Sequence, residues 1–164
     1  MKKAVDMQVS EKKALIASLF HDCAKYLALA DEKLSGFRLD KAYGEVPESV
    51  LHQFTGAYLA EEQFGVTDAE TLDAIRYHTS GKEGMSELGK IIFLADMVEE
   101  ERAFDGVDKL RLLFYEKKGR GALDQCLLEA LAQTLEYLRA RGAEIYPLTL
   151  QAYNYYKKGE TKDE

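Results

Sequence analysis

The sequence predicts an all-α fold, a bundle of about seven helices. Apolar residues recur every three or four positions along nearly the whole 164-residue chain, and no comparable alternation of apolar and polar residues predicts a strand. Glycines stand where helices should end: Gly65, Gly81 and Gly142 each follow such a segment and can adopt the left-handed conformation of a helix terminus. With 46% hydrophobic residues, the chain can bury the core of one domain over residues 1–164.

Seven helices are expected, over residues 10–30, 47–63, 68–78, 87–100, 108–117, 122–141 and 147–157. The apolar residues at helical spacing are Leu15, Leu19 and Phe20; Leu51, Phe54 and Tyr58; Leu72 and Ile75; Leu88, Ile91, Ile92 and Ala95; and Leu127, Leu128, Leu131 and Leu135. Residues 31–46 are expected to form a loop or a short helix, and residues 158–164 a frayed tail.

Three helix starts are marked by residues that suit an N-terminus. Pro47 fits the first turn of a helix, because its fixed φ and missing N–H are tolerated there. Thr67 and Glu70 have the spacing of a capping box, in which each side chain accepts from the other's backbone N–H. Ser86 is expected to cap the helix that follows it.

The composition excludes several classes of function. A formal net charge of −7 argues against broad nucleic-acid binding, which needs an excess of Lys and Arg on one face. No apolar run approaches the roughly 20 residues that span a bilayer, so no membrane partner is expected. Cys23 and Cys126 have neither zinc-finger spacing nor the density of a disulfide scaffold, which is typical of reduced thiols in a cytoplasmic protein.

The three histidines of the chain, with two aspartates, form its most informative pattern. His21 is followed at once by Asp22, while His52, His78 and Asp96 lie on later predicted helices. Imidazole nitrogens and carboxylate oxygens are ligands of iron, manganese and zinc, and a helical bundle can bring them together. Each histidine alone could instead be a satisfied interior residue, and His78 could simply interact with the end of its helix.

Asp96 interrupts the most hydrophobic run of the chain, residues 91–98. A buried carboxylate needs a Lys or Arg, hydrogen-bond donors or a metal ion, unless the helix has one exposed edge there. Lys25 shares a helix face with Asp22 and is either its salt-bridge partner or a phosphate contact. The polar turn at residues 79–81 could donate hydrogen bonds to a phosphate or merely follow the end of a helix.

Four segments carry a family resemblance. They are HDCAK at residues 21–25, AIRYHTSG at 74–81, KIIFLAD at 90–96 and RAFDGVD at 102–108. Together they resemble the bacterial YqeK-type family of the HD-domain metal-dependent phosphohydrolases, over nearly the whole chain. The resemblance implies an HD-domain helical bundle, a homodimer, and symmetrical hydrolysis of diadenosine tetraphosphate to two ADP.

The resemblance also implies a two-iron site. One iron would be bound by His21, Asp22 and Asp96, and the other by Asp22, His52 and His78, so that Asp22 bridges them; manganese or zinc would suit the same ligands. A metal-bound hydroxide is the implied nucleophile, because metals lower the pKa of bound water.

The remaining site residues are also assigned by resemblance. The catalytic residues would be Asp22 and Lys25. The contacts to substrate phosphate would be Lys25, Thr79 and Arg102. Arg102 has an alternative role, which is to pair with Glu99 or Asp105.

One departure from the family pattern concerns the metal bound by His21. The family has another histidine ligand on a helix ahead of the His-Asp pair, and no histidine precedes His21 here. We expect a natural chain with a further N-terminal helix; the alternatives are water in that position, or a weakened or inactive relative that binds a nucleotide. The alternative among enzymes is an HD phosphohydrolase acting on another nucleotide.

Overall fold

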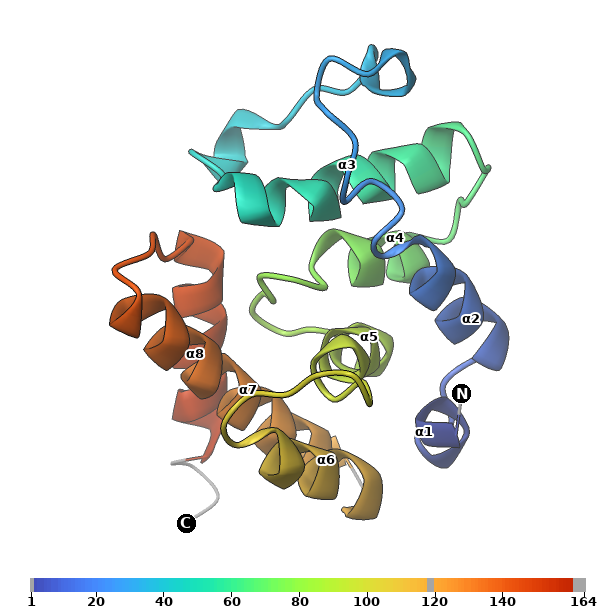
Figure 1. The fold of residues 1–164 in the computed structure, drawn as a ribbon. Helices are drawn as coiled ribbons and strands as arrows, with labels where there is room; N and C mark the ends of the chain where they lie inside the picture. The colour runs from blue at the N-terminus through green and yellow to red at the C-terminus, as the bar shows by residue number, and fades with distance from the viewer. Residues whose placement is uncertain (1, 118–119, 161–164) are drawn as a thin grey trace.

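The computed structural model describes residues 2–117 and 120–160, and no strand occurs among them (Figure 1). The α-helices are α1 (Lys2–Asp6), α2 (Glu11–Phe20), α3 (Glu48–Glu62), α4 (Ala69–Arg76), α5 (Glu87–Met97), α6 (Val107–Glu116), α7 (Arg120–Ala140) and α8 (Pro147–Glu160). Two short 3₁₀ helices, η1 (Glu32–Leu34) and η2 (Lys41–Tyr43), lie where a loop or short helix was expected. The all-α fold class is confirmed. None of the described helices is both long and apolar enough to cross a membrane.

Helix α5 lies between two apolar clusters at the centre of the fold (Figure 1). Its Leu88 and Ile92 pack with residues of α1, α2, α3 and α4. Its Ile91 and Leu94 pack with residues of α6, α7 and α8. A helix that is apolar nearly all round is stable only when it is buried on most sides, which accounts for this central place. Packing on both faces also fixes the C-terminal end of α5, where Asp96 lies.

The first predicted helix is shorter than expected, because α2 ends at Phe20 rather than at residue 30. Residues 21–26 form a succession of turns instead. These turns pass close to Gly56 of α3, where an added Cβ would lie 3.4 Å from the carbonyl oxygen of His21. The close crossing with α3 is a tertiary contact, which apolar spacing within the segment does not reveal.

One predicted helix start is confirmed and another is wrong. The Ser86 hydroxyl accepts a hydrogen bond from the Gly89 N–H at 3.1 Å and caps α5, as expected. Helix α4, however, is capped by Asp68, whose Oδ1 accepts from the Thr71 N–H at 2.9 Å. The predicted capping box at Thr67 is therefore wrong, because the carboxylate one residue later reaches the third residue of the helix.

The outer ends of the helices differ from the prediction by a few residues. Helix α1 was not expected at all. Pro47 is the N-cap residue of α3, one position before the helix rather than inside it. Helix α8 continues to Glu160, so the expectation of a frayed tail is wrong for residues 158–160, and residues 161–164 lie outside the described residues.

Two of the three glycine stops are confirmed, at Gly65 and Gly142, whereas α4 already ends at Arg76 and Gly81 follows a further turn. Gly65, Gly81 and Gly142 have positive φ angles of 67°, 66° and 60°. At Gly81 an added Cβ would also lie 3.4 Å from the side chain of Ala152 in α8. The turn that follows His78 is therefore packed against the last helix, which limits its freedom to move.

Replacing Ser86 with Ala should destabilise the protein by about 1 kcal/mol, because the Gly89 N–H at the start of the central helix would lose its capping partner. Ser86→Thr keeps the hydroxyl and is the matched control. Urea denaturation followed by circular dichroism measures both variants. Equal stability of Ser86→Ala and the wild type would contradict the assigned cap.

Candidate metal centre

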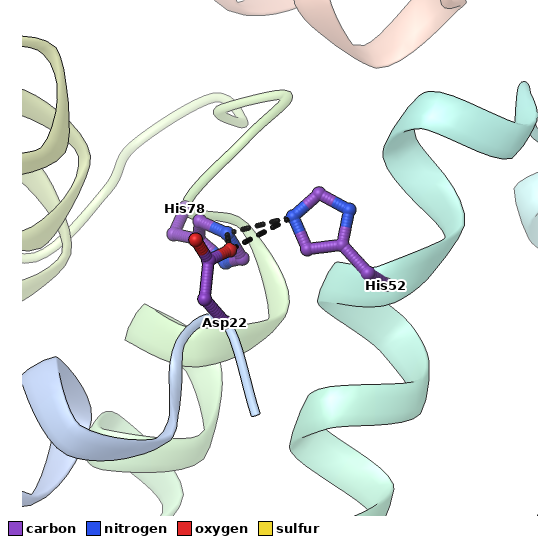
Figure 2. Close-up of side chains that lie close together, drawn as sticks. All are labelled: Asp22, His52 and His78. Atoms are coloured by element: carbon purple, nitrogen blue, oxygen red, sulfur yellow. Dashed lines mark hydrogen bonds and ion pairs between the residues drawn. The ribbon is translucent and has the colours of Figure 1, made fainter. Parts of the chain in front are cut away.

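The segments after α2 and α4, together with α3, bring a carboxylate and two imidazoles together (Figure 2). Asp22 lies in the turn after α2, His52 in the first half of α3, and His78 just beyond α4. The His52 and His78 Nε2 atoms are 3.1 Å apart. Asp22 Oδ1 lies 3.3 Å from His52 Nε2 and 3.4 Å from His78 Nε2. Three potential ligand atoms therefore meet at one point.

Backbone carbonyls orient the imidazole rings. Nδ1 of His21 lies 2.7 Å from the carbonyl oxygen of Ser18, and Nδ1 of His78 lies 2.8 Å from that of Ile75. A carbonyl oxygen can only accept, so in the neutral ring the proton is on Nδ1 and Nε2 carries the lone pair. A ring nitrogen fixed in this way by its partner on the far side is typical of metal-binding histidines.

The charges at this point also suit a cation. Burial, followed by the proximity of His78, lowers the pKa of His52 to about 4, so that ring is neutral at neutral pH. The contact with His78 and then the Lys25 ammonium hold the pKa of Asp22 well below its usual range. Two imidazoles and an ionised carboxylate are the forms in which these groups bind a divalent metal. The donor set therefore fits a metal ion.

A second group of ligands shares Asp22. His21, Asp22 and Asp96 have ligand atoms within 4.8 Å of one another. Asp22 Oδ2 faces His21 Nε2 at 3.7 Å, whereas Oδ1 faces the other two histidines. All five candidate metal ligands predicted from the sequence thus lie in two adjoining groups, with Asp22 common to both.

Two cations border the carboxylates. Lys25 Nζ lies 2.6 Å from Asp22 Oδ2. Arg102 Nη2 lies 2.7 Å from Asp96 Oδ1, and its Nε donates to the Asp96 carbonyl at 3.2 Å. The ion pair of Arg102 is therefore with Asp96, and not with Glu99 or Asp105 as the sequence also allowed. Asp96 therefore has the Arg partner that its place beside the hydrophobic run required.

Thr79 completes the set of residues predicted from the sequence. Its Oγ1 lies 3.1 Å from His52 Nε2 and 3.0 Å from His78 Nε2. The hydroxyl thus stands at the meeting point of the two rings, where a phosphate oxygen next to a metal would also lie within reach. Its position is compatible with the expected phosphate contact.

Sequence reasoning missed Gln53, which joins the two histidine-bearing segments. Its side chain is fully buried; its Oε1 accepts from the Ser80 N–H at 3.0 Å and its Nε2 donates to Ser80 Oγ at 2.9 Å. Because Gln53 follows His52 and Ser80 lies two residues after His78, these bonds fix one histidine relative to the other. The sequence did contain one indication of this role, because Gln53 is a polar residue among the apolar residues of α3.

The chain is similar to known proteins of one family. A family model described as the HD domain matches residues 1–101. The chain belongs to the HD-domain family. It is 39% identical over 155 residues to a Bacillus subtilis protein named symmetrical bis(5'-nucleosyl)-tetraphosphatase, a match that covers 90% of this chain and 78% of the relative. The Halalkalibacterium halodurans protein of the same name is 37% identical, with 94% of this chain and 83% of the relative covered.

A solved structure extends the comparison to three dimensions. The crystal structure of a predicted HD superfamily hydrolase involved in NAD metabolism from Clostridium acetobutylicum superposes with a TM-score of 0.81 at 32% identity. The match covers 96% of this chain and 82% of that one. These relatives confirm the YqeK-type resemblance of this HD-domain chain.

Metal binding should stabilise the protein through the histidines. Manganese at 100 times its dissociation constant should add about 2.7 kcal/mol to the free energy of unfolding, which raises the Tm by about 5–10 °C for a domain of this size. The His78→Ala variant should lose most of this shift, because its ring belongs to the group with Asp22 and His52. Differential scanning calorimetry measures both.

Asp73→Asn is the control for this experiment. Asp73 pairs with Lys82 at 2.6 Å and belongs to neither ligand group, so its variant should keep the full manganese shift. If His78→Ala retained the same shift as Asp73→Asn, the assignment of His78 to a metal centre would be wrong.

Proposed function

We propose that this chain is a metal-dependent hydrolase that cleaves diadenosine tetraphosphate symmetrically into two ADP. The observation that carries the proposal is the pair of ligand groups that share Asp22, bordered by Lys25 and Arg102. The names of the Bacillus and Halalkalibacterium relatives support the choice of substrate. The HD-domain membership supports the choice of a hydrolytic reaction.

In this proposal the two ligand groups hold a pair of metal ions. One ion would be held by His21, Asp22 and Asp96 and the other by Asp22, His52 and His78. We infer iron, with manganese or zinc as ions that the same nitrogen and oxygen ligands accept. When bound, such ions lower the pKa of water and neutralise charge on phosphoryl oxygens.

The chain's own cations would bind the polyphosphate. Lys25 and Arg102 each pair with a carboxylate, and both side chains are partly exposed, so a phosphate can approach them. Arg102 can offer two parallel N–H donors to phosphate oxygens, whereas Lys25 offers a compact point charge. Thr79 Oγ1 adds a neutral donor beside the two imidazoles.

The reaction balances as a simple hydrolysis. The oxygen of one water joins one of the two central phosphorus atoms, and the bond from that phosphorus to the central bridging oxygen breaks. The leaving ADP keeps the bridging oxygen, and each cleavage gives two ADP. The family resemblance also leads us to infer a cytoplasmic homodimer, which light scattering and cell fractionation test.

The purified chain, loaded anaerobically with ferrous iron, should convert diadenosine tetraphosphate to ADP alone. In ¹⁸O-labelled water, half of the ADP should carry one labelled oxygen, because water attacks one half of each substrate molecule. Chromatography with mass spectrometry measures both results. Asp22→Asn should lower turnover by at least about 100-fold, since the carboxylate shared by both groups would be lost.

Asp73→Asn is again the matched control and should keep wild-type turnover, because Asp73 pairs with Lys82 outside the site. If the products were ATP and AMP, the cleavage would be asymmetrical and the proposed symmetrical reaction would be wrong. Nucleotide binding without turnover, in protein shown to contain metal, would instead favour a non-catalytic relative.

A further inference from the structure

The loop after α5 depends on one side chain from another helix. Four backbone carbonyls of this loop accept hydrogen bonds from the Arg111 guanidinium of α6. Nε donates to Val98 at 3.2 Å, and Nη2 is within hydrogen-bond distance of Glu99 at 2.6 Å, Glu100 at 3.2 Å and Arg102 at 2.8 Å. Carbonyls past a helix end have no partner within the helix, and here the Arg111 side chain supplies the donors.

Arg111 itself is held firmly. Its neighbours on α6, Leu110 and Phe114, are buried in the core cluster with α7 and α8. Its Nη1 donates to Asp108 one turn earlier at 3.1 Å. Gly106 is the N-cap residue of α6, and an added Cβ there would lie only 2.8 Å from the side chain of Gln133 in α7. The helix is therefore a fixed base from which Arg111 reaches the loop.

The far end of the loop carries Arg102, which points at the candidate metal centre. Its guanidinium is bonded to both the carbonyl and the carboxylate of Asp96. Asp96 in turn belongs to the ligand group with His21 and Asp22. A continuous series of contacts therefore leads from the buried face of α6, through Arg111 and the loop, to Arg102 and Asp96 at the candidate metal centre.

We propose that Arg111 is a positioning residue that fixes the 98–102 loop so that Arg102 can bind a substrate phosphate beside Asp96. This inference rests on the proposed function, because it takes the phosphate of a nucleotide as the partner of Arg102. The donors of Arg111 point at backbone carbonyls and at Asp108, so it acts through Arg102 rather than on substrate. Lysine could not replace it, because its donors radiate from one atom and cannot span the separated carbonyls.

The test is a double-mutant cycle on diadenosine tetraphosphate hydrolysis by the iron-loaded chain. Arg111→Met should raise the KM on the order of 10-fold, the loss expected when one charge-assisted contact to phosphate is misplaced, with a smaller change in kcat. In the Arg102→Ala background, Arg111→Met should change the KM less than about 2-fold. Arg111→Lys should raise the KM by a similar factor, and it replaces Arg111→Met in the experiment if that variant folds poorly.

Lys109→Met is the matched control, because it removes a cation of the same helix whose partner is Glu129 at 2.9 Å, away from the loop. Hydrogen exchange of the 98–102 amides gives a readout that does not depend on activity. Exchange should accelerate in Arg111→Met and Arg111→Lys but not in Lys109→Met.

The outcomes separate this inference from the proposed function. If the wild type fails to cleave diadenosine tetraphosphate, the proposed function fails, and the substrate role given to Arg111 fails with it. If the wild type is active, an equal effect of Arg111→Met with and without Arg102 would show a general structural role and overturn the inference. Unchanged loop exchange in Arg111→Met would overturn it as well.

Discussion

The candidate centre depends on where helices α2 and α4 end. A helix terminus leaves carbonyls without an intrahelical partner. Near these two ends, the carbonyls of Ser18 and Ile75 face Nδ1 of the histidine three residues later. The same contact that satisfies the carbonyl turns Nε2 of His21 and His78 towards Asp22.

The placement of Asp96 shows how an apolar helix can carry a charged ligand at low cost. Leu88, Ile92 and Asp96 share one row of α5, and the first two are almost completely buried. A carboxylate in the middle of that row would face a large desolvation penalty. At the last turn its side chain is 25% exposed and pairs with Arg102, so the charge is solvated and compensated. Burial of Leu88 and Ile92 fixes the direction of the Asp96 side chain. Its place in the last turn lowers the desolvation penalty of the carboxylate.

Apolar spacing in the sequence was enough to predict the fold class and seven helices, while the resemblance to a known family assigned the five candidate ligands. Other features required the tertiary structure. Helix α2 ends early where the following turns pass close to Gly56 of α3. The ion-pair partner of Arg102 depends on the loop after α5, which Arg111 of α6 contacts. The cap of α4 was misassigned because Thr67 and Asp68 are both good N-cap residues.

Exposure changes across the site in a way that gives a direction of approach. The His78 side chain is 2% exposed and that of His52 is 11%, whereas Asp22 reaches 31%. Lys25 and Arg102, at 35% and 42%, are the most open of these side chains. A long polyanion would therefore meet the two more exposed cations first and the more buried ligands last. Gln53 holds the segments that carry the inner ligands, and Arg102 lies on the 98–102 loop that Arg111 of α6 contacts. In the proposed function, the more exposed cations would exchange their carboxylate partners for phosphate while the inner ligands stay in place.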